Sequence, residues 1–174
     1  MKGTSCFYIR IAIWGPPASG KTILALKLGK ILDIPVYHSD ALFHNKLARH
    51  LSVNILKRRI IPLLKTPNWI IDGYFGELRR EVAKRATKIV ILNPPLRKLI
   101  LRIAFRTYRS RTMESENWFL LTISLVKIAV IYKLRTFRSF VDIAYQHLDK
   151  SSATIVEEES LSAIFMRFKE LNIL

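Results

Sequence analysis

One eight-residue segment of the sequence carries the pattern of a phosphate-binding loop. It reads GPPASGKT and fits G-x-x-x-x-G-K-[ST] at every required position, with the residues Gly15, Pro16, Pro17, Ala18, Ser19, Gly20, Lys21 and Thr22. The glycines let the backbone turn tightly, so that successive N–H groups face one anion. Lys21 can place its charge near the β- and γ-phosphates of a nucleotide, and the Thr22 hydroxyl can bind Mg²⁺. The segment therefore predicts a P-loop, which by itself is specific only for nucleotide phosphates.

Two aspartates follow apolar runs and could take part in phosphoryl transfer. Asp72 follows the run WII at 69–71, as a Walker-B-type carboxylate follows its strand, and could bind Mg²⁺ directly or through water. The alternative is a turn residue, because Asp-Gly is a common turn pair. Asp40 ends a second run and could position an acceptor, act as general base to an acceptor hydroxyl, or assist the metal. The alternative for Asp40 is helix capping or a structural hydrogen bond.

Three arginines have the spacing of one helix face. Arg102, Arg106 and Arg109 lie at i, i+4 and i+7. Such a cluster can neutralise charge on a transferring phosphoryl group and bind acceptor phosphate. The alternative is a basic face that only contacts water. We predict a catalytic role for all three, with Arg106 at the centre of the set.

The rest of the chain supplies the elements that must hold these residues. Short apolar runs predict strands at 7–14, 36–39, 69–71, 89–92 and 153–156, and helical patterns occupy about 20–32, 46–65, 77–85, 96–111, 117–148 and 160–171. Strands that alternate with helices indicate right-handed β-α-β units and a parallel sheet with helices on both faces. The predicted fold class is α/β, with three layers around a five-stranded parallel sheet. The P-loop, Asp40 and Asp72 then meet at the carboxyl ends of the strands, where ligands of such sheets bind.

Length, charge and cysteine content limit the alternatives. The 174 residues predict a single domain over 1–174, and the one cysteine, Cys6, rules out an internal disulfide and suggests the reducing cytoplasm. The net charge of +16 favours polyanions such as nucleotides, nucleic acid or anionic lipid. The apolar run at 118–132 is too short for a membrane span, so integral insertion is not expected. An amphipathic helix packed on the domain and a helix on a membrane surface both remain open.

The sequence also resembles a known family, the small adenylate-kinase-like P-loop kinases, especially bacterial P-loop proteins of the topology-modulation and flagellar-regulator type. The matching pieces cover roughly residues 7–111 and are GPPASGKT (15–22), IPVYHSDALF (34–43), WIIDGYFG (69–76), and an arginine-rich helix after IVILNPP (89–95). One departure concerns the acceptor. Nucleoside monophosphate kinases of this type carry Asp-Gly-Phe-Pro-Arg after the third strand, whereas this chain has DGYFG at 72–76. The usual acceptor-phosphate arginine is therefore unassigned.

The resemblance implies residue roles as well as a fold. It implies a five-stranded parallel sheet, binding of ATP·Mg²⁺, and a mobile lid carried by the arginine-rich helix, here a helical lid or insert at about 96–148. Lys21 and Thr22 then serve phosphate and Mg²⁺, and Asp72 serves Mg²⁺. Asp40 falls on the acceptor side, and Arg102, Arg106 and Arg109 fall in the lid.

Three functions follow from these patterns. The first is a Mg-ATP-dependent kinase, a phosphotransferase acting on a small phosphorylated or hydroxylated acceptor such as a nucleotide. The second is a nucleotide-binding regulatory protein that engages nucleic acid through its basic surface. The third is an ATPase at a membrane surface that uses the 118–148 helix. The sequence does not identify the acceptor or the oligomeric state.

Overall fold

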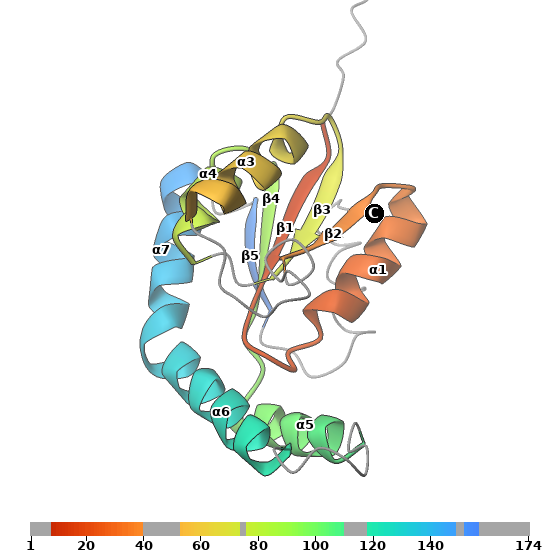
Figure 1. Cartoon of the computed structure of the whole chain (residues 1–174). Helices are drawn as coiled ribbons and strands as arrows, with labels where there is room; N and C mark the ends of the chain where they lie inside the picture. The colour runs from red at the N-terminus through yellow and green to blue at the C-terminus, as the bar shows by residue number, and fades with distance from the viewer. Residues whose placement is uncertain (1–7, 40–52, 74–75, 110–117, 149–151, 157–174) are drawn as a thin grey trace, which may run out of the picture.

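The centre of the structure is a parallel five-stranded sheet. The computed structural model describes residues 8–39, 53–73, 76–109, 118–148 and 152–156. The strands are β1 (Arg10–Trp14), β2 (Val36–His38), β3 (Trp69–Asp72), β4 (Lys88–Leu92) and β5 (Ala153–Val156). They lie in the order β2-β3-β1-β4-β5, and every pairing is parallel (Figure 1). The predicted fold class is therefore confirmed.

The strands form where apolar residues run without interruption. All four residues of β3 are buried, as are the last four residues of β1 and of β4. This pattern is typical of parallel strands covered on both faces. The predicted strands agree with the observed ones within a few residues. The largest difference is at β1, where Tyr8 and Ile9 precede the strand.

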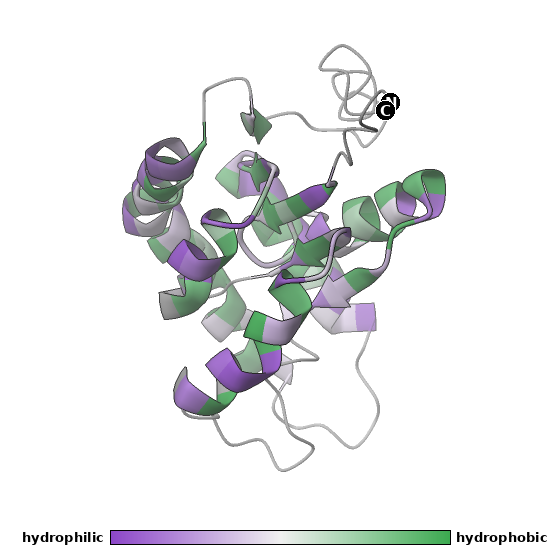
Figure 2. Ribbon diagram, turned by 90° about the horizontal axis from the view of Figure 1, so that it is seen from above, coloured by the Kyte–Doolittle hydropathy of each residue, from purple (hydrophilic) through white to green (hydrophobic). Residues whose placement is uncertain are grey.

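Helices cover both faces of the sheet. On one face, α1 (Lys21–Leu32) buries Leu24, Ala25 and Leu28 against strand residues such as Ile13 and Val90. The other face is covered by α3 (Val53–Leu64), the short helix η1 (Gly76–Leu78), α4 (Arg79–Ala83) and α7 (Phe137–His147). Hydrophilic and hydrophobic residues alternate along the helices around the sheet (Figure 2). The predicted helix at 160–171 and the start of the one at 46–65 lie outside the described residues.

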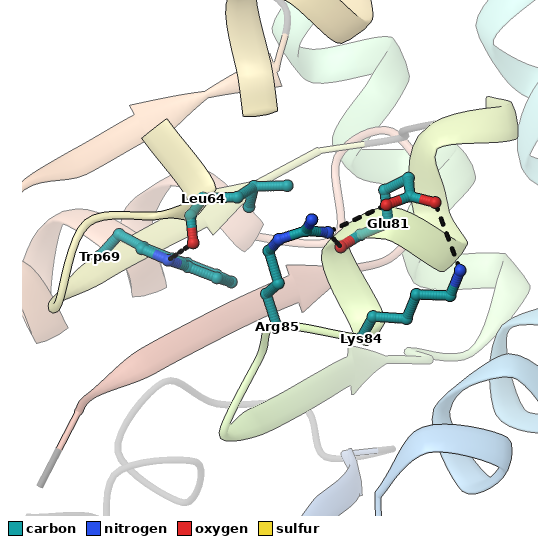
Figure 3. Close-up of polar contacts among 5 residues, drawn as sticks. All are labelled: Leu64, Trp69, Glu81, Lys84 and Arg85. Atoms are coloured by element: carbon teal, nitrogen blue, oxygen red, sulfur yellow. Dashed lines mark hydrogen bonds and ion pairs between the residues drawn. The ribbon is translucent and has the colours of Figure 1, made fainter. Parts of the chain in front are cut away.

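Polar contacts lie at the segment that leads from α3 into β3 and at α4 (Figure 3). The buried indole of Trp69 donates a hydrogen bond to the Leu64 carbonyl, at 3.4 Å. On α4, Glu81 pairs with Arg85 at 2.9 Å and with Lys84 at 3.4 Å. The hydrogen bond from Arg85 lowers the pKa of Glu81. These pairs lie near the surface, so they contribute little to stability.

The helices after β4 form an arm at the P-loop end of the sheet (Figure 1). It consists of α5 (Leu96–Arg109) and α6 (Trp118–Ile131), which pack against each other. A π-helical segment, η2 (Tyr132–Thr136), then joins α6 to α7. The region 117–148, predicted as one helix, is thus helical over Trp118–His147 with a π-helical turn inside it. Such turns are frequent at functional sites.

Candidate active site

The P-loop connects the end of β1 to the start of α1. Gly20 has a φ of 96° immediately before the helix, a conformation that L side chains rarely adopt. Gly15 is needed for a different reason. A Cβ there would lie 2.9 Å from the Leu92 carbonyl oxygen and 2.9 Å from Ser19 Oγ. The two glycines therefore permit a tight turn pressed against the end of β4.

The N-terminus of α1 is open to an anion. No side chain caps it, and its first turn contains no acidic residue. The first N–H groups of a helix lack intrahelical partners and carry partial positive charge. Ser19 Oγ, which is buried, has no hydrogen-bond partner among the described residues. Lys21 Nζ donates to the Pro16 carbonyl at 2.8 Å, so the ammonium lies across the loop that it belongs to.

Asp72 occupies the centre of the candidate metal site. Thr22 Oγ1 donates to Asp72 Oδ2 at 2.7 Å, which joins the start of α1 to the end of β3. The other carboxylate oxygen, Oδ1, lies 2.5 Å from His38 Nδ1. Asp72 is 3% exposed, so its carboxylate is almost fully enclosed by these neighbours. A hydroxyl and a carboxylate are hard oxygen ligands, so the pair Thr22 and Asp72 fits Mg²⁺.

The turn interpretation of Asp72 concerns the pair that it forms with Gly73. Asp72 is the last residue of β3, paired with Ile13 and His38 in the neighbouring strands, and its side chain bonds to other elements. Gly73 has a φ of 142°, and a Cβ there would lie 1.5 Å from Ser39 Oγ. Glycine is therefore required so that the chain after β3 can pass the end of β2. Asp72 itself is a strand residue, and the tight passage of the backbone is made by Gly73.

The three predicted arginines lie on α5, which borders the P-loop. Ala18 of the loop packs against Leu99, Ile103 and Ala129, the buried cluster between α5 and α6. Arg102 is half-buried, and Arg106 and Arg109 are exposed. The helix that carries the arginines is thus in contact with the phosphate-binding loop. Asp40, the other predicted catalytic residue, lies outside the described residues.

Sequence reasoning assigned no role to His38, and its contact with Asp72 depends on strand register. β2 pairs with β3 so that His38 lies beside Asp72 at the carboxyl ends of both strands. A histidine at the end of an apolar run was the only sequence signal. The order of strands along the chain does not say which strands are neighbours in the sheet, so the contact between His38 and Asp72 could not be predicted from the sequence.

Lys133 is a second residue that the sequence did not indicate. Its Nζ donates to Asn93 Oδ1 at 2.5 Å and to the Asn93 carbonyl at 3.1 Å. Asn93 follows β4 directly, and its neighbour Leu92 contacts Gly15. Lys133 therefore brings a positive charge to the same rim of the sheet as the P-loop. The π-helical segment that holds it has no sequence pattern by which it could be predicted.

An aromatic cluster borders this rim on the face away from α1. The ring of Phe140 lies 5.4 Å from Trp14 and 5.2 Å from Tyr132, and the Arg79 guanidinium lies 4.2 Å above it. The indole nitrogen of Trp14 is buried without a hydrogen-bond partner among the described residues. Burial raises the pKa of the Tyr132 phenol, so this hydroxyl stays protonated. Two neutral donors and a guanidinium thus gather beside the end of β1.

Comparison with known proteins finds solved structures that share the fold of this chain. No protein-family model matches the sequence, and no curated protein matches it either. A shikimate kinase from Bacteroides thetaiotaomicron matches with a TM-score of 0.60 at 16% identity, over 95% of this chain and 99% of that one. A shikimate kinase from Acinetobacter baumannii, solved in complex with shikimate, gives 0.56 at 19% identity, over 94% and 90%. A gluconokinase from Sinorhizobium meliloti gives 0.55 at 15% identity, over 96% and 93%.

These neighbours are kinases that share one architecture with this chain. At such identities the likeness concerns the fold, and it agrees with the predicted general group of small P-loop kinases. The narrower topology-modulation and flagellar-regulator type stays a prediction, and the nucleic-acid interpretation gains no support from these neighbours. The chain has the three-layer α/β fold of small P-loop kinases.

Proposed function

We propose that the protein is a Mg-ATP-dependent kinase that transfers the γ-phosphoryl group of ATP to a hydroxyl of a small anionic acceptor. The observation that carries this proposal is the contact between Thr22 and Asp72 beside the P-loop, at 2.7 Å. It brings the two expected magnesium ligands together across two elements. The shared fold with shikimate kinase and gluconokinase supports the same reaction class.

The P-loop residues have divided roles in this proposal. The backbone of the segment 15–22 binds the phosphates of ATP, and Lys21 screens the charge that develops at the γ-phosphate. Thr22 and Asp72 hold Mg²⁺, which when bound neutralises phosphate charge. Asp40 accepts the proton of the acceptor hydroxyl or positions it. His38 holds the Asp72 carboxylate from the side opposite Thr22.

We further propose that the arm formed by α5 and α6 is the lid of a single kinase domain spanning 1–174. The packing of Ala18 against Leu99 and Ile103 supports this, because movement of α5 would change the surroundings of the P-loop. Arg102, Arg106 and Arg109 then approach the transferring phosphate when the arm closes. Excluding water in this way strengthens each charge interaction in the site.

Arg106 provides a test of the lid. We expect Arg106→Ala and Arg106→Lys to lower kcat by at least about tenfold while ATP affinity changes less, because the contact is made in the transition state. Lysine fails to restore the rate because it lacks the planar two-pronged donor geometry of arginine. Steady-state kinetics and ATP titration at two salt concentrations measure this.

The matched control for Arg106 is Arg138→Ala, which removes an exposed arginine on α7. Both side chains are exposed, so both variants should change the free energy of unfolding by no more than about 0.5 kcal/mol. Parent-like turnover in both Arg106 variants would mean that this face of α5 has no catalytic role and only contacts water.

Lys133 is the residue that we assign to acceptor binding. It lies in η2, next to Tyr132 and the aromatic cluster, on the sheet face opposite α1. A lysine ammonium can attract a carboxylate or phosphate as a point charge. Asn93, which Lys133 contacts, follows β4 at the same rim as the P-loop, so a negative group of the acceptor bound at Lys133 would lie at that rim.

We expect Lys133→Met to raise the KM for the acceptor by about tenfold or more, since a charged hydrogen bond is lost, and to change the KM for ATP little. Lys127→Met is the control, because Lys127 is an exposed lysine on the preceding helix. Both KM values are measured for the two variants. An increase confined to the KM for ATP would move Lys133 from the acceptor site to the nucleotide site.

An acceptor screen tests the proposed function as a whole. Candidate hydroxylated carboxylates, sugar acids and nucleoside monophosphates are added one at a time to protein with ATP and Mg²⁺, and ADP is measured. We expect ADP release to rise with one chemical class, and the phosphorylated product to appear in equal amount. Absence of any acceptor-dependent ADP, together with steeply salt-dependent RNA or DNA retention, would favour the regulatory nucleic-acid interpretation instead.

A further inference from the structure

Helix α6 is apolar on all sides, yet it buries little of its surface. Its sequence, WFLLTISLVKIAVI, contains one charged residue, Lys127. A helix of this composition is normally enclosed by protein or lipid. Here it packs against α5, and Ala129 is the only fully buried residue between Trp118 and Ile131. Five of its large side chains are exposed: Phe119, Leu120, Leu121, Ile128 and Ile131.

Several of the exposed apolar side chains lie where α5 ends and α6 begins. Thr122 Oγ1 donates to Thr107 Oγ1 at 2.8 Å, which shows that the last turns of α5 lie against the first turns of α6. These turns carry five large side chains that are each between 50% and 75% exposed, and we call them the tip surface: Phe105, Tyr108, Phe119, Leu120 and Leu121. Three of the five are aromatic. Aromatic rings are enriched at the boundary between lipid and water.

The charged residues near the tip surface are mostly basic, and this favours an anionic partner. From Arg97 to Arg138 the sequence has ten basic and two acidic residues, and α5 itself contains no acidic residue. Arg106 and Arg109, both exposed, lie in the last turn of α5 beside Phe105 and Tyr108. A second copy of this chain docked tip to tip would bring these arginines against one another, which is unfavourable. A surface rich in anionic lipid headgroups complements them.

The length of the helices decides how such a surface is contacted. No helix among the described residues is long and apolar enough to cross a membrane. Apolar side chains on the surface of a helix can instead be buried in the interface between lipid and water.

We propose that the tip surface docks the protein on an anionic membrane, with Phe105, Tyr108, Phe119, Leu120 and Leu121 in the interface and the arginines of α5 at the lipid headgroups. Docking does not require the proposed kinase reaction. While the arm is docked, Arg106 and Arg109 contact headgroups instead of the transferring phosphate, so docking and closure of the lid would exclude each other. Docking makes the arm a peripheral membrane anchor placed directly beside the P-loop. Binding requires both components, because a few partly inserted side chains or a few cations alone give weak association.

The test is co-flotation of the full-length protein with vesicles. Phosphatidylcholine vesicles are compared with vesicles that also contain phosphatidylglycerol, at low and high salt. We expect binding to the anionic vesicles, loss of most binding at high salt, and little binding to phosphatidylcholine alone. In the double variant Phe105→Ser with Leu120→Ser, the partition coefficient should fall by at least about tenfold.

A matched control separates the tip from general surface hydrophobicity. Leu26 and Ile31 on α1 are 53% and 57% exposed, so Leu26→Ser with Ile31→Ser removes two exposed apolar side chains elsewhere. This control should bind vesicles as the parent does. Equal loss in both double variants, or no flotation of the parent, would overturn the proposal. So would a parent dimer in sedimentation that the Phe105 and Leu120 changes dissociate, because a second copy would then cover the tip.

Discussion

Replacing Lys21 with methionine should abolish nearly all acceptor-dependent ADP production while leaving the protein folded. Methionine has a similar length and no charge, so the substitution removes the ammonium that screens the ATP phosphates. Electrostatic groups of this kind lower the barrier by several kcal/mol, which corresponds to roughly 100-fold or more in rate. Lys21 Nζ donates to the Pro16 carbonyl within its own loop, and methionine keeps most of the length of the side chain, so we expect the fold to tolerate the change.

The measurement for Lys21→Met is turnover and ATP affinity, with thermal unfolding to show that the variant is folded. Lys30→Met is the matched control, because it removes an exposed lysine from the last turn of the same helix. It should leave turnover unchanged. Parent-like turnover and ATP affinity in folded Lys21→Met would mean that the loop does not bind catalytic phosphate, and the proposed function would fail with it.

The sheet could be predicted from sequence because parallel strands are buried on both faces. Uninterrupted apolar runs at β1, β3 and β4, separated by helical segments and prolines, leave few other arrangements. The P-loop was visible because its chemistry restricts residue types at fixed spacing. Asp72 was visible because the carboxyl end of a strand is where ligands bind in such sheets. Each of these predictions depends on a local pattern or on a general rule of the fold.

The candidate site residues that the sequence did not indicate depend on contacts between distant parts of the chain. His38 meets Asp72 because of the register between β2 and β3, and Lys133 reaches Asn93 across 40 positions of sequence. Neither contact leaves a local pattern. The packing of α6 is a third example, since the sequence left open whether this helix packs on the domain, and the structure packs it against α5 with several large side chains exposed. Tertiary packing determines the two contacts and the exposure of α6. The residues that bind the acceptor also depend on tertiary packing, so the sequence does not identify the acceptor.

Asp72 provides the second test with a large expected effect. Asparagine keeps an oxygen that can accept the hydrogen bond from Thr22, but it removes the negative charge that a magnesium ligand needs. We expect Asp72→Asn to fold and to require at least about tenfold more Mg²⁺ for half-maximal activity. The rate at saturating Mg²⁺ should recover in part. Measuring activity and ATP binding over a Mg²⁺ titration, with thermal unfolding in the absence of metal, separates these effects.

Replacing His38 distinguishes a charge effect at Asp72 from a packing effect. His38→Gln removes the ring that contacts Asp72 Oδ1 and leaves the carboxylate and Thr22 in place. If His38 only positions the carboxylate, this variant should raise the Mg²⁺ requirement less than Asp72→Asn does, because the charge remains. If both variants kept the parental Mg²⁺ dependence with normal turnover, Asp72 would be a structural residue at the end of β3. The carboxylate would then be enclosed between Thr22 and His38 to hold α1 and β2 against β3, and the metal would have to be bound by other residues.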